Sequence, residues 1–165
     1  MPDRSTRQAF DLFLAVATQL NRELLIVPVL YGSLGLARVL HASQSVGDVD
    51  ILVPAAFLAQ RWPELLALME RLHFALVDAR EHEFRRGDES VAFADQESLV
   101  PFANVDPGTL ATATVQGVHF KELSPQDYLA VYRVSQHDGY RRDKRGKRDA
   151  EKIAQIETFL KQQAS

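Results

Sequence analysis

The sequence predicts an α/β (α+β) fold, in which a mixed β-sheet with flanking helices is followed by a short helical C-terminal part. Three observations support this prediction. The chain has 165 residues, of which 46% are hydrophobic, enough to bury a core in one domain. Segments with helical spacing alternate with short apolar runs in the first half of the chain. Two strand-like pairs with glycine-containing turns follow in the second half.

The first half contains alternating helices and buried strands. Apolar residues at helical spacing predict a first helix that ends near Leu24. The run 25–31 predicts a buried strand, with regular pairing only after Pro28, because proline lacks the N–H that a strand ladder needs. A short helix over 34–41 and a loop over 42–47 lead to a second strand, 49–53.

A helical stretch over 55–74 comes next, broken near Arg61, with Pro63 in the first turn of its second segment. Strands over 75–86 and 90–95 are predicted to form a hairpin around Gly87. A second hairpin joins 111–115 to 118–121 through the turn residues Gln116 and Gly117.

The last part of the chain is predicted to be helical. Ser124 and Pro125 fit a helix start, and this helix is expected to run to about His137 and to end at Gly139. Apolar residues from Ile153 onward predict a final helix. We therefore expect a core over 1–122 and a helical extension over 123–165 packed on it.

Composition excludes several classes of protein. There is no cysteine, which excludes disulfides, thiolate metal sites and thiol catalysis. The net charge of -3 gives no overall attraction to nucleic acid. The first residues are polar, and nowhere are there about 18 consecutive apolar residues, so we expect no signal peptide, no membrane span and a cytoplasmic location.

The most informative motif combines Gly32 and Ser33, at the end of one apolar strand, with Asp48 and Asp50, at the start of the next. Side chains two apart on a strand point to the same face, so the two carboxylates can converge on one ion. Carboxylate oxygens suit Mg²⁺ or Mn²⁺, whose coordination substrate phosphates often complete. The pair therefore predicts a catalytic metal site.

Other patterns are weaker. Gly32 and Gly35 match neither the Walker loop nor the dinucleotide fingerprint. No two of the five histidines have the spacing of a metal site, although the triplet Glu81-His82-Glu83 could line an acceptor pocket. Six of the eight residues over 141–148 are basic. We interpret this run as a solvated loop, with phosphate or RNA contact by Lys144, Arg145 or Lys147 as the alternative.

The two halves of the main motif, Leu30-Tyr31-Gly32-Ser33 and Ser45-Val46-Gly47-Asp48-Val49-Asp50-Ile51-Leu52-Val53, together resemble the nucleotidyltransferase superfamily that includes DNA polymerase beta. A second motif consists of residues 123–129 followed by Lys147-Arg148-Asp149. It resembles a motif in the branch of small drug-modifying and toxin-like transferases. The first match covers about a quarter of the chain and the second another quarter.

The resemblance implies a role for each motif residue. Ser33 and the amides that open the following helix would hold a nucleoside triphosphate, and Gly32 would allow close approach. Lys147 is a further candidate for nucleotide binding. Asp48 and Asp50 would bind Mg²⁺ (or Mn²⁺) and act in catalysis.

Family members usually add a third carboxylate, which serves as a metal ligand or as the general base. Asp95, at the end of the strand 90–95, is our first candidate for this catalytic and metal-binding position. Glu83 is the second candidate. If neither carboxylate reaches the metals, a nucleotide-binding relative without catalysis becomes the better description.

The resulting hypothesis is a Mg²⁺-dependent enzyme that transfers a nucleoside monophosphate from a nucleoside triphosphate such as ATP to a hydroxyl of a small-molecule acceptor. One alternative is a toxin-like transferase acting on tRNA or protein. Another is a non-catalytic nucleotide-binding or interaction module. A homodimer or a partner chain is left open.

Overall fold

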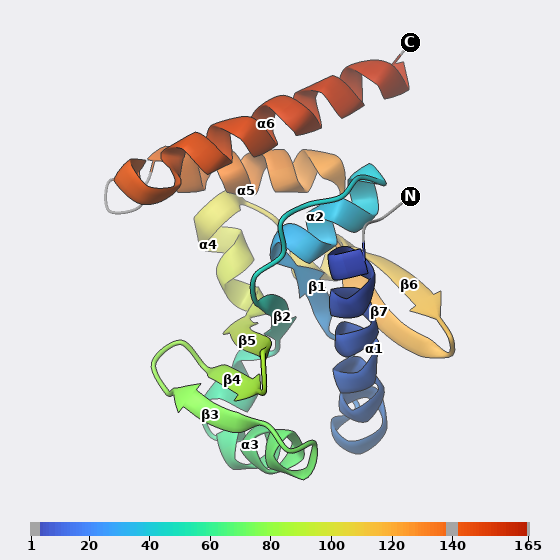
Figure 1. The fold of residues 1–165 in the computed structure, drawn as a ribbon, viewed down its shortest axis with the longest axis vertical. Coiled ribbons are helices and arrows are strands. Elements are labelled where there is room, and N and C mark those ends of the chain that lie inside the picture. The colour runs from blue at the N-terminus through green and yellow to red at the C-terminus, as the bar shows by residue number, and fades with distance from the viewer. Residues whose placement is uncertain (1–3, 138–141, 165) are drawn as a thin grey trace.

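The computed structural model describes residues 4–137 and 142–164, with side chains described over 6–137 and 149–164. Within this part, a seven-stranded sheet with the order β3-β4-β5-β2-β1-β7-β6 forms the centre of the molecule (Figure 1). The strands are β1 (Val29–Tyr31), β2 (Val49–Val53), β3 (Ala75–Asp78), β4 (Glu83–Arg86), β5 (Glu89–Asp95), β6 (Ala111–Val115) and β7 (Val118–Glu122).

The sheet is mixed, as the sequence predicts. Strand β1 pairs antiparallel with β2 and parallel with β7, while β2 pairs parallel with β5. The outer strands are antiparallel hairpins, β4 with β5 and β6 with β7. Both predicted hairpin turns are present, at Gly87 and at Gln116-Gly117, where all three residues have the positive φ that tight hairpins require.

Helices cover both faces of the sheet. One core cluster joins α1 and α3 to the sheet face that carries Val49, Ile51 and Val53. A second cluster joins α2, α4, α5 and α6 to the opposite face, which carries Val29 and Leu52. The helices are α1 (Arg4–Leu24), α2 (Gly32–Leu40), α3 (Trp62–Arg71), α4 (Leu99–Ala103), α5 (Pro125–His137) and α6 (Arg142–Ala164).

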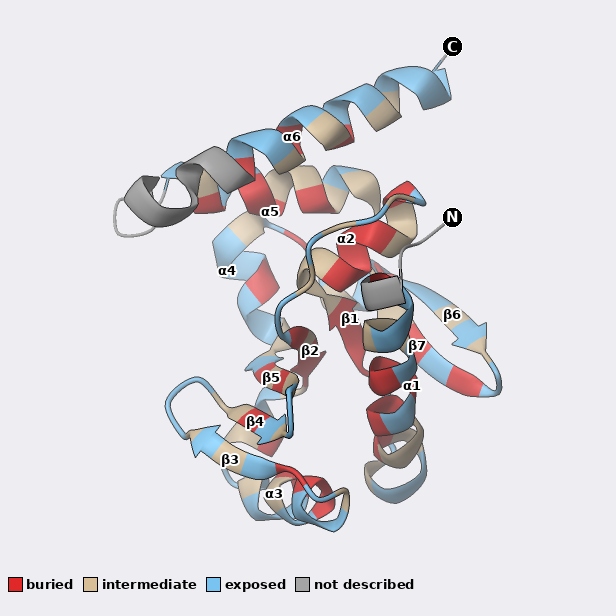
Figure 2. Cartoon of the chain, viewed as in Figure 1, coloured by how far each residue is buried: buried red, intermediate tan, exposed pale blue. Residues whose placement is uncertain are grey.

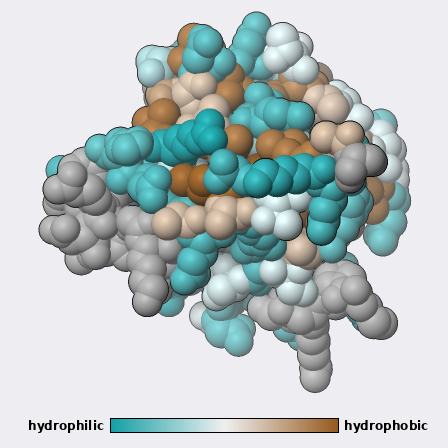
Figure 3. All heavy atoms as spheres, turned by 90° about the horizontal axis from the view of Figure 1, so that it is seen from above, coloured by the Kyte–Doolittle hydropathy of each residue, from teal (hydrophilic) through white to brown (hydrophobic). Residues whose placement is uncertain are grey.

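The two last helices, α5 and α6, lie side by side over the second cluster (Figure 1). Their buried residues face each other and α2, while the outer side of α6 is exposed (Figure 2). Seen from the α6 side, the described surface mixes hydrophilic and hydrophobic side chains (Figure 3). Among the described helices, none combines the length and apolarity that crossing a membrane requires.

The structure corrects three expectations. The run predicted as a buried strand over 25–31 pairs only from Val29, after Pro28 as expected, but it is not buried throughout, because Leu25 has a φ of 55° and is 87% exposed. The strand predicted over 75–86 divides into β3 and β4. The Asp78 carboxylate accepts the backbone N–H groups of Arg80 and Glu81, and this forms a turn.

The third correction concerns the basic run. Residues 142–148 lie in the first turns of α6 rather than in a loop. The predicted end of α5 at Gly139 lies outside the described residues. The short helix α4 was not predicted. The residue that could have indicated it is Asp95, whose carboxylate accepts the backbone N–H of Ser98 in the turn before α4.

Candidate functional site

Asp50 lies on a central strand, on the sheet face that α5 and α6 cover. It pairs with Tyr31 of β1 and with Ala92 of β5, so these three side chains share one face. Asp50 is half-buried, whereas Asp48, one residue before β2, is exposed. The predicted pair of carboxylates therefore stands where β2 begins.

Gly32 is in direct contact with Asp50. Its φ is +68°, and a Cβ added there would lie 2.2 Å from Oδ2 of Asp50. Atoms cannot approach so closely, so any side chain at this position would displace the carboxylate. The structure thus brings together the two halves of the sequence motif, at the turn from β1 into α2.

Gly35 has a similar function one turn further along α2. A Cβ there would lie 2.0 Å from the hydroxyl oxygen of Tyr128 and 3.0 Å from the carbonyl oxygen of Leu30. Because the space is free, the Tyr128 hydroxyl donates to the Leu30 carbonyl at 3.3 Å. This contact ties α5 to the end of β1, directly before the site.

Ser33 stands in the first turn of α2, where backbone N–H groups point outward and the helix dipole is positive. Its hydroxyl accepts a hydrogen bond from Nζ of Lys152, on α6, at 3.0 Å. The same ammonium lies 5.0 Å from the centre of the Tyr132 ring. Lys152 thus joins α6 to both α2 and α5.

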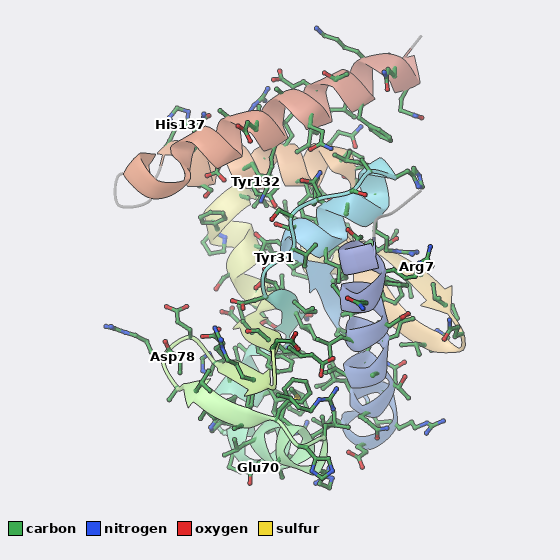
Figure 4. All side chains as sticks on the ribbon, in the orientation of Figure 1. Arg7, Tyr31, Glu70, Asp78, Tyr132 and His137 are labelled. Carbon is green, nitrogen blue, oxygen red and sulfur yellow. The ribbon has the colours of Figure 1, made fainter. Side chains whose placement is uncertain are left out.

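Three tyrosines form a stacked row beside these residues. Tyr31 and Tyr128 have ring centres 6.2 Å apart, and Tyr128 and Tyr132 have ring centres 6.1 Å apart. Tyr31, at the end of β1, and Tyr132, on α5, lie one above the other in the middle of the molecule (Figure 4). Burial raises the pKa of the Tyr128 and Tyr132 hydroxyls, and the negative charge of Asp50 raises both further.

Asp95, the first candidate for a third carboxylate, lies away from Asp50. It pairs with Val53 at the far end of β2, and the alternation of side chains places it on the opposite face of the sheet. Its carboxylate accepts the backbone N–H and the hydroxyl of Ser98. The structure therefore does not bring Asp95 to the Asp48–Asp50 pair.

Glu83, the second candidate, lies in the same row as Asp50. Ala92 of β5 pairs with Asp50 on one side and with Glu83 of β4 on the other, so all three side chains point to the same face. Neighbouring strands are about 4.8 Å apart, and in this row the one residue between Asp50 and Glu83 is the small Ala92. Oε1 of Glu83 accepts a hydrogen bond from the Ser90 hydroxyl at 3.1 Å. The same oxygen forms an ion pair with Nη2 of Arg85 at 3.6 Å.

The remaining predicted residues are placed as follows. The side chain of Lys147 lies outside the described residues, although its backbone is in α6. His82 packs its ring against Trp62, with ring centres 5.0 Å apart, so it is part of the packing around α3. Sequence reasoning did not identify Lys152, and the signal for it was its position next to Ile153 and one turn before Ile156, on the apolar side of the last helix.

No cluster of three side chains able to hold a metal forms among the described residues. The two carboxylates, Asp48 and Asp50, nevertheless fit Mg²⁺, which proteins often bind through one or two carboxylates with phosphate oxygens completing the shell. These ligands are hard oxygen donors, and no softer donor is among the residues that the structure groups with them.

Comparison with solved structures identifies the fold. The solution structure of the antibiotic-resistance factor ANT(2'')-Ia superposes with a TM-score of 0.61, at 15% identity, over 94% of this chain and 85% of that one. A nucleotidyltransferase-like protein from Paracoccidioides brasiliensis gives a TM-score of 0.58, at 17% identity, over 90% of this chain and 74% of that one. The fold is therefore that of the nucleotidyltransferase superfamily, as the motif predicts.

A relative at the sequence level defines the family more closely. The chain belongs to the family of YnaI, an uncharacterized protein of Bacillus subtilis (strain 168). The two sequences are 39% identical over 144 residues, which is 87% of this chain and 92% of the relative. No family model matches the sequence.

Proposed function

We propose that this protein is a Mg²⁺-dependent nucleotidyltransferase, which moves a nucleoside monophosphate from a nucleoside triphosphate such as ATP to a hydroxyl of a small-molecule acceptor. The observation that carries the proposal is the contact of Gly32 with Asp50. This contact brings the Asp50 carboxylate against the start of α2. A helix N-terminus suits phosphate and a carboxylate pair suits magnesium, so the two halves fit one metal–triphosphate complex.

Each residue has a separate task in this proposal. Asp48 and Asp50 would hold magnesium, and the chemistry that the metal would supply when bound is neutralisation of phosphate charge. Ser33 and the first amides of α2 hold the tail of the triphosphate. Gly32 keeps side chains away from the phosphates and leaves Asp50 in place.

The acceptor side is assigned to Glu83, which shares the sheet face of Asp50. Its carboxylate takes the proton of the acceptor hydroxyl as the oxygen attacks the α-phosphorus. The new bond joins the acceptor oxygen to this phosphorus. The bond to the bridging oxygen of the leaving group breaks, and pyrophosphate departs with the electron pair. Asp95, on the opposite face, is left out of this mechanism.

A small acceptor is supported by a fold neighbour and by charge. One solved structure with this fold is ANT(2'')-Ia in complex with adenylyl-2''-tobramycin, a nucleotide joined to a small molecule; its TM-score is 0.59, at 15% identity, over 93% of this chain. The net charge of this chain is -3, which does not favour a long nucleic acid. Transfer to tRNA would instead depend on the basic run 141–148, whose side chains lie outside the described residues.

The test combines binding with product release. Magnesium-ATP and magnesium-GTP are titrated into the wild type and Asp50→Asn by calorimetry, and pyrophosphate release is measured with and without tobramycin as a hydroxylic probe. We expect Asp50→Asn to slow magnesium-dependent release at least about 100-fold, or about 3 kcal/mol. The unfolding free energy should change by less than about 1 kcal/mol, since neutralisation relieves repulsion between two carboxylates.

A matched control is Asp11→Asn, which removes an exposed carboxylate from α1 and should leave binding and turnover unchanged. Nucleotide binding without pyrophosphate release in the presence of the acceptor probe would favour the non-catalytic module. A wild type that binds neither triphosphate would contradict the proposal altogether.

A further inference from the structure

Lys152 is the residue of α6 that reaches the start of α2. We infer that Lys152 is a triphosphate-binding residue, which its hydrogen bond to Ser33 holds at the start of α2. The inference rests on the proposed function, because it names a residue of the same site. It differs from the sequence-based expectation, which placed the binding lysine at Lys147.

The first argument is electrostatic. Nζ of Lys152 lies 3.0 Å from Oγ of Ser33, and Ser33 is in the first turn of the nine-residue helix α2. The N-terminal end of a helix carries partial positive charge, which favours an anion and disfavours a cation. The charge of the Lys152 ammonium is therefore unfavourable beside the N-terminal end of α2. A phosphate between the ammonium and the helix end would be attracted by both.

The second argument is the position of the ammonium. Lys152 is half-buried, and its ammonium also lies 5.0 Å from the Tyr132 ring centre, so α5 and α6 together fix its direction. A lysine held in this way loses little conformational freedom when it binds, which favours affinity. Ser33, in turn, is one residue from Gly32, against which Asp50 is placed. The turn from β1 into α2 is thus contacted from two sides. Lys152 reaches it from α6, and Asp50 reaches it from β2.

The third, independent argument is Asp149, one turn earlier on α6. Its side chain is 4% exposed, and among the described residues its Oδ2 atom has no hydrogen-bond partner. Buried carboxylate oxygens are normally hydrogen-bonded, so such a group indicates a site rather than simple packing. The negative charges of Asp50 and Asp149 both raise the pKa of the Tyr132 hydroxyl, and Lys152 lies against the same tyrosine ring. Asp149 therefore faces the same region as Lys152, three residues away on the helix.

The experiment compares binding of magnesium-ATP and of AMP, measured by calorimetry, in the wild type, Lys152→Met, Lys152→Arg and Lys161→Met. We expect Lys152→Met to weaken magnesium-ATP binding about tenfold or more and AMP binding less than about twofold, because AMP lacks the outer phosphates. Lys152→Arg keeps the charge and should retain most of the affinity. Lys161→Met removes an exposed lysine from the same helix and should bind as the wild type does.

Lys152→Gln serves as a second variant, since its amide can still donate to Ser33 while the charge is lost. It should bind magnesium-ATP as weakly as Lys152→Met, and its melting temperature should match that of the wild type. If the wild type binds magnesium-ATP and both neutral variants bind equally well, the inference is overturned while the proposed function stands. If the wild type binds no triphosphate, the proposed function fails and the inference fails with it.

Discussion

Gly32 has two properties that no other residue type combines. Its backbone has a φ of +68°, which L-residues with a side chain adopt at a cost, and its missing Cβ leaves room for Oδ2 of Asp50. We therefore expect Gly32→Ala to lower the unfolding free energy by about 1–2 kcal/mol through the backbone. It should also abolish magnesium-dependent nucleotide binding, because Asp50 must move. Urea unfolding and calorimetry measure the two effects.

The matched control is Gly87→Ala, in the turn between β4 and β5. Gly87 has a φ of +62°, almost the same as that of Gly32, but a Cβ there would meet nothing within 4 Å. This substitution should lower stability by a similar amount, about 1–2 kcal/mol, and leave nucleotide binding intact. Equal loss of binding in the two variants would show that Gly32 acts through stability alone.

Glu83 and Asp95 give a second contrast at the scale of single residues. Glu83 shares a row with Asp50, so Glu83→Gln should reduce pyrophosphate release about tenfold or more while the dissociation constant for magnesium-ATP stays unchanged. A carboxylate that accepts the proton of the acceptor hydroxyl contributes to turnover and not to nucleotide binding. Steady-state turnover and calorimetry separate these quantities.

Asp95→Asn is the comparison for this prediction. The Asp95 carboxylate accepts the backbone N–H and hydroxyl of Ser98 at the turn before α4, which is a capping role. Its replacement should lower stability by about 0.5–1 kcal/mol without slowing turnover. A turnover loss in Asp95→Asn that exceeds the loss in Glu83→Gln would reverse the assignment of the third carboxylate.

At the scale of elements, the local motifs could be predicted and the long-range contacts could not. Strand β2 and helix α2 follow from short apolar patterns, and the Gly32–Ser33 turn with the Asp48–Asp50 pair lies within 19 residues of sequence. The break of 75–86 into β3 and β4 was missed, because its cause is the Asp78 side chain, which accepts two backbone N–H groups. An apolar pattern carries no information on such a turn.

The choice between Asp95 and Glu83 depends on register. Only the pairing of β2 with β5 and of β5 with β4 shows that Glu83 shares a face with Asp50 and that Asp95 does not. Lys152 is a stronger case, because it meets Ser33 across 119 residues of sequence. The docking of α6 on α2 follows from tertiary packing, so sequence reasoning could propose a lysine near this position but not this one.

At the scale of the whole molecule, the three tyrosines connect the sheet to the C-terminal helices. Tyr31 comes from β1, whereas Tyr128 and Tyr132 come from α5, and the Tyr128 hydroxyl donates to the Leu30 carbonyl. Two of these rings are buried within the cluster that holds α5 and α6 on the sheet. A buried tyrosinate has a large desolvation cost, so the packing of α5 and α6 requires the Tyr128 and Tyr132 hydroxyls to stay uncharged. The position of Lys152, on α6, depends on this packing.

This dependence predicts how stability responds to alkaline pH. Burial, with the charges of Asp50 and Asp149 nearby, raises the pKa of the Tyr132 hydroxyl above its ordinary value of 10.0. Above that pH the unfolded chain loses the proton while the folded chain keeps it. The contribution to stability is thus complete below about pH 10 and is lost as the pH rises toward the folded-state pKa.

Tyr132→Phe has no such proton, so its unfolding free energy should fall less than that of the wild type between pH 9 and pH 11, by up to about 1.4 kcal/mol. Urea unfolding of both proteins at the two pH values measures this difference, and an equal fall in both would mean that Tyr132 ionises in the folded protein as easily as in water.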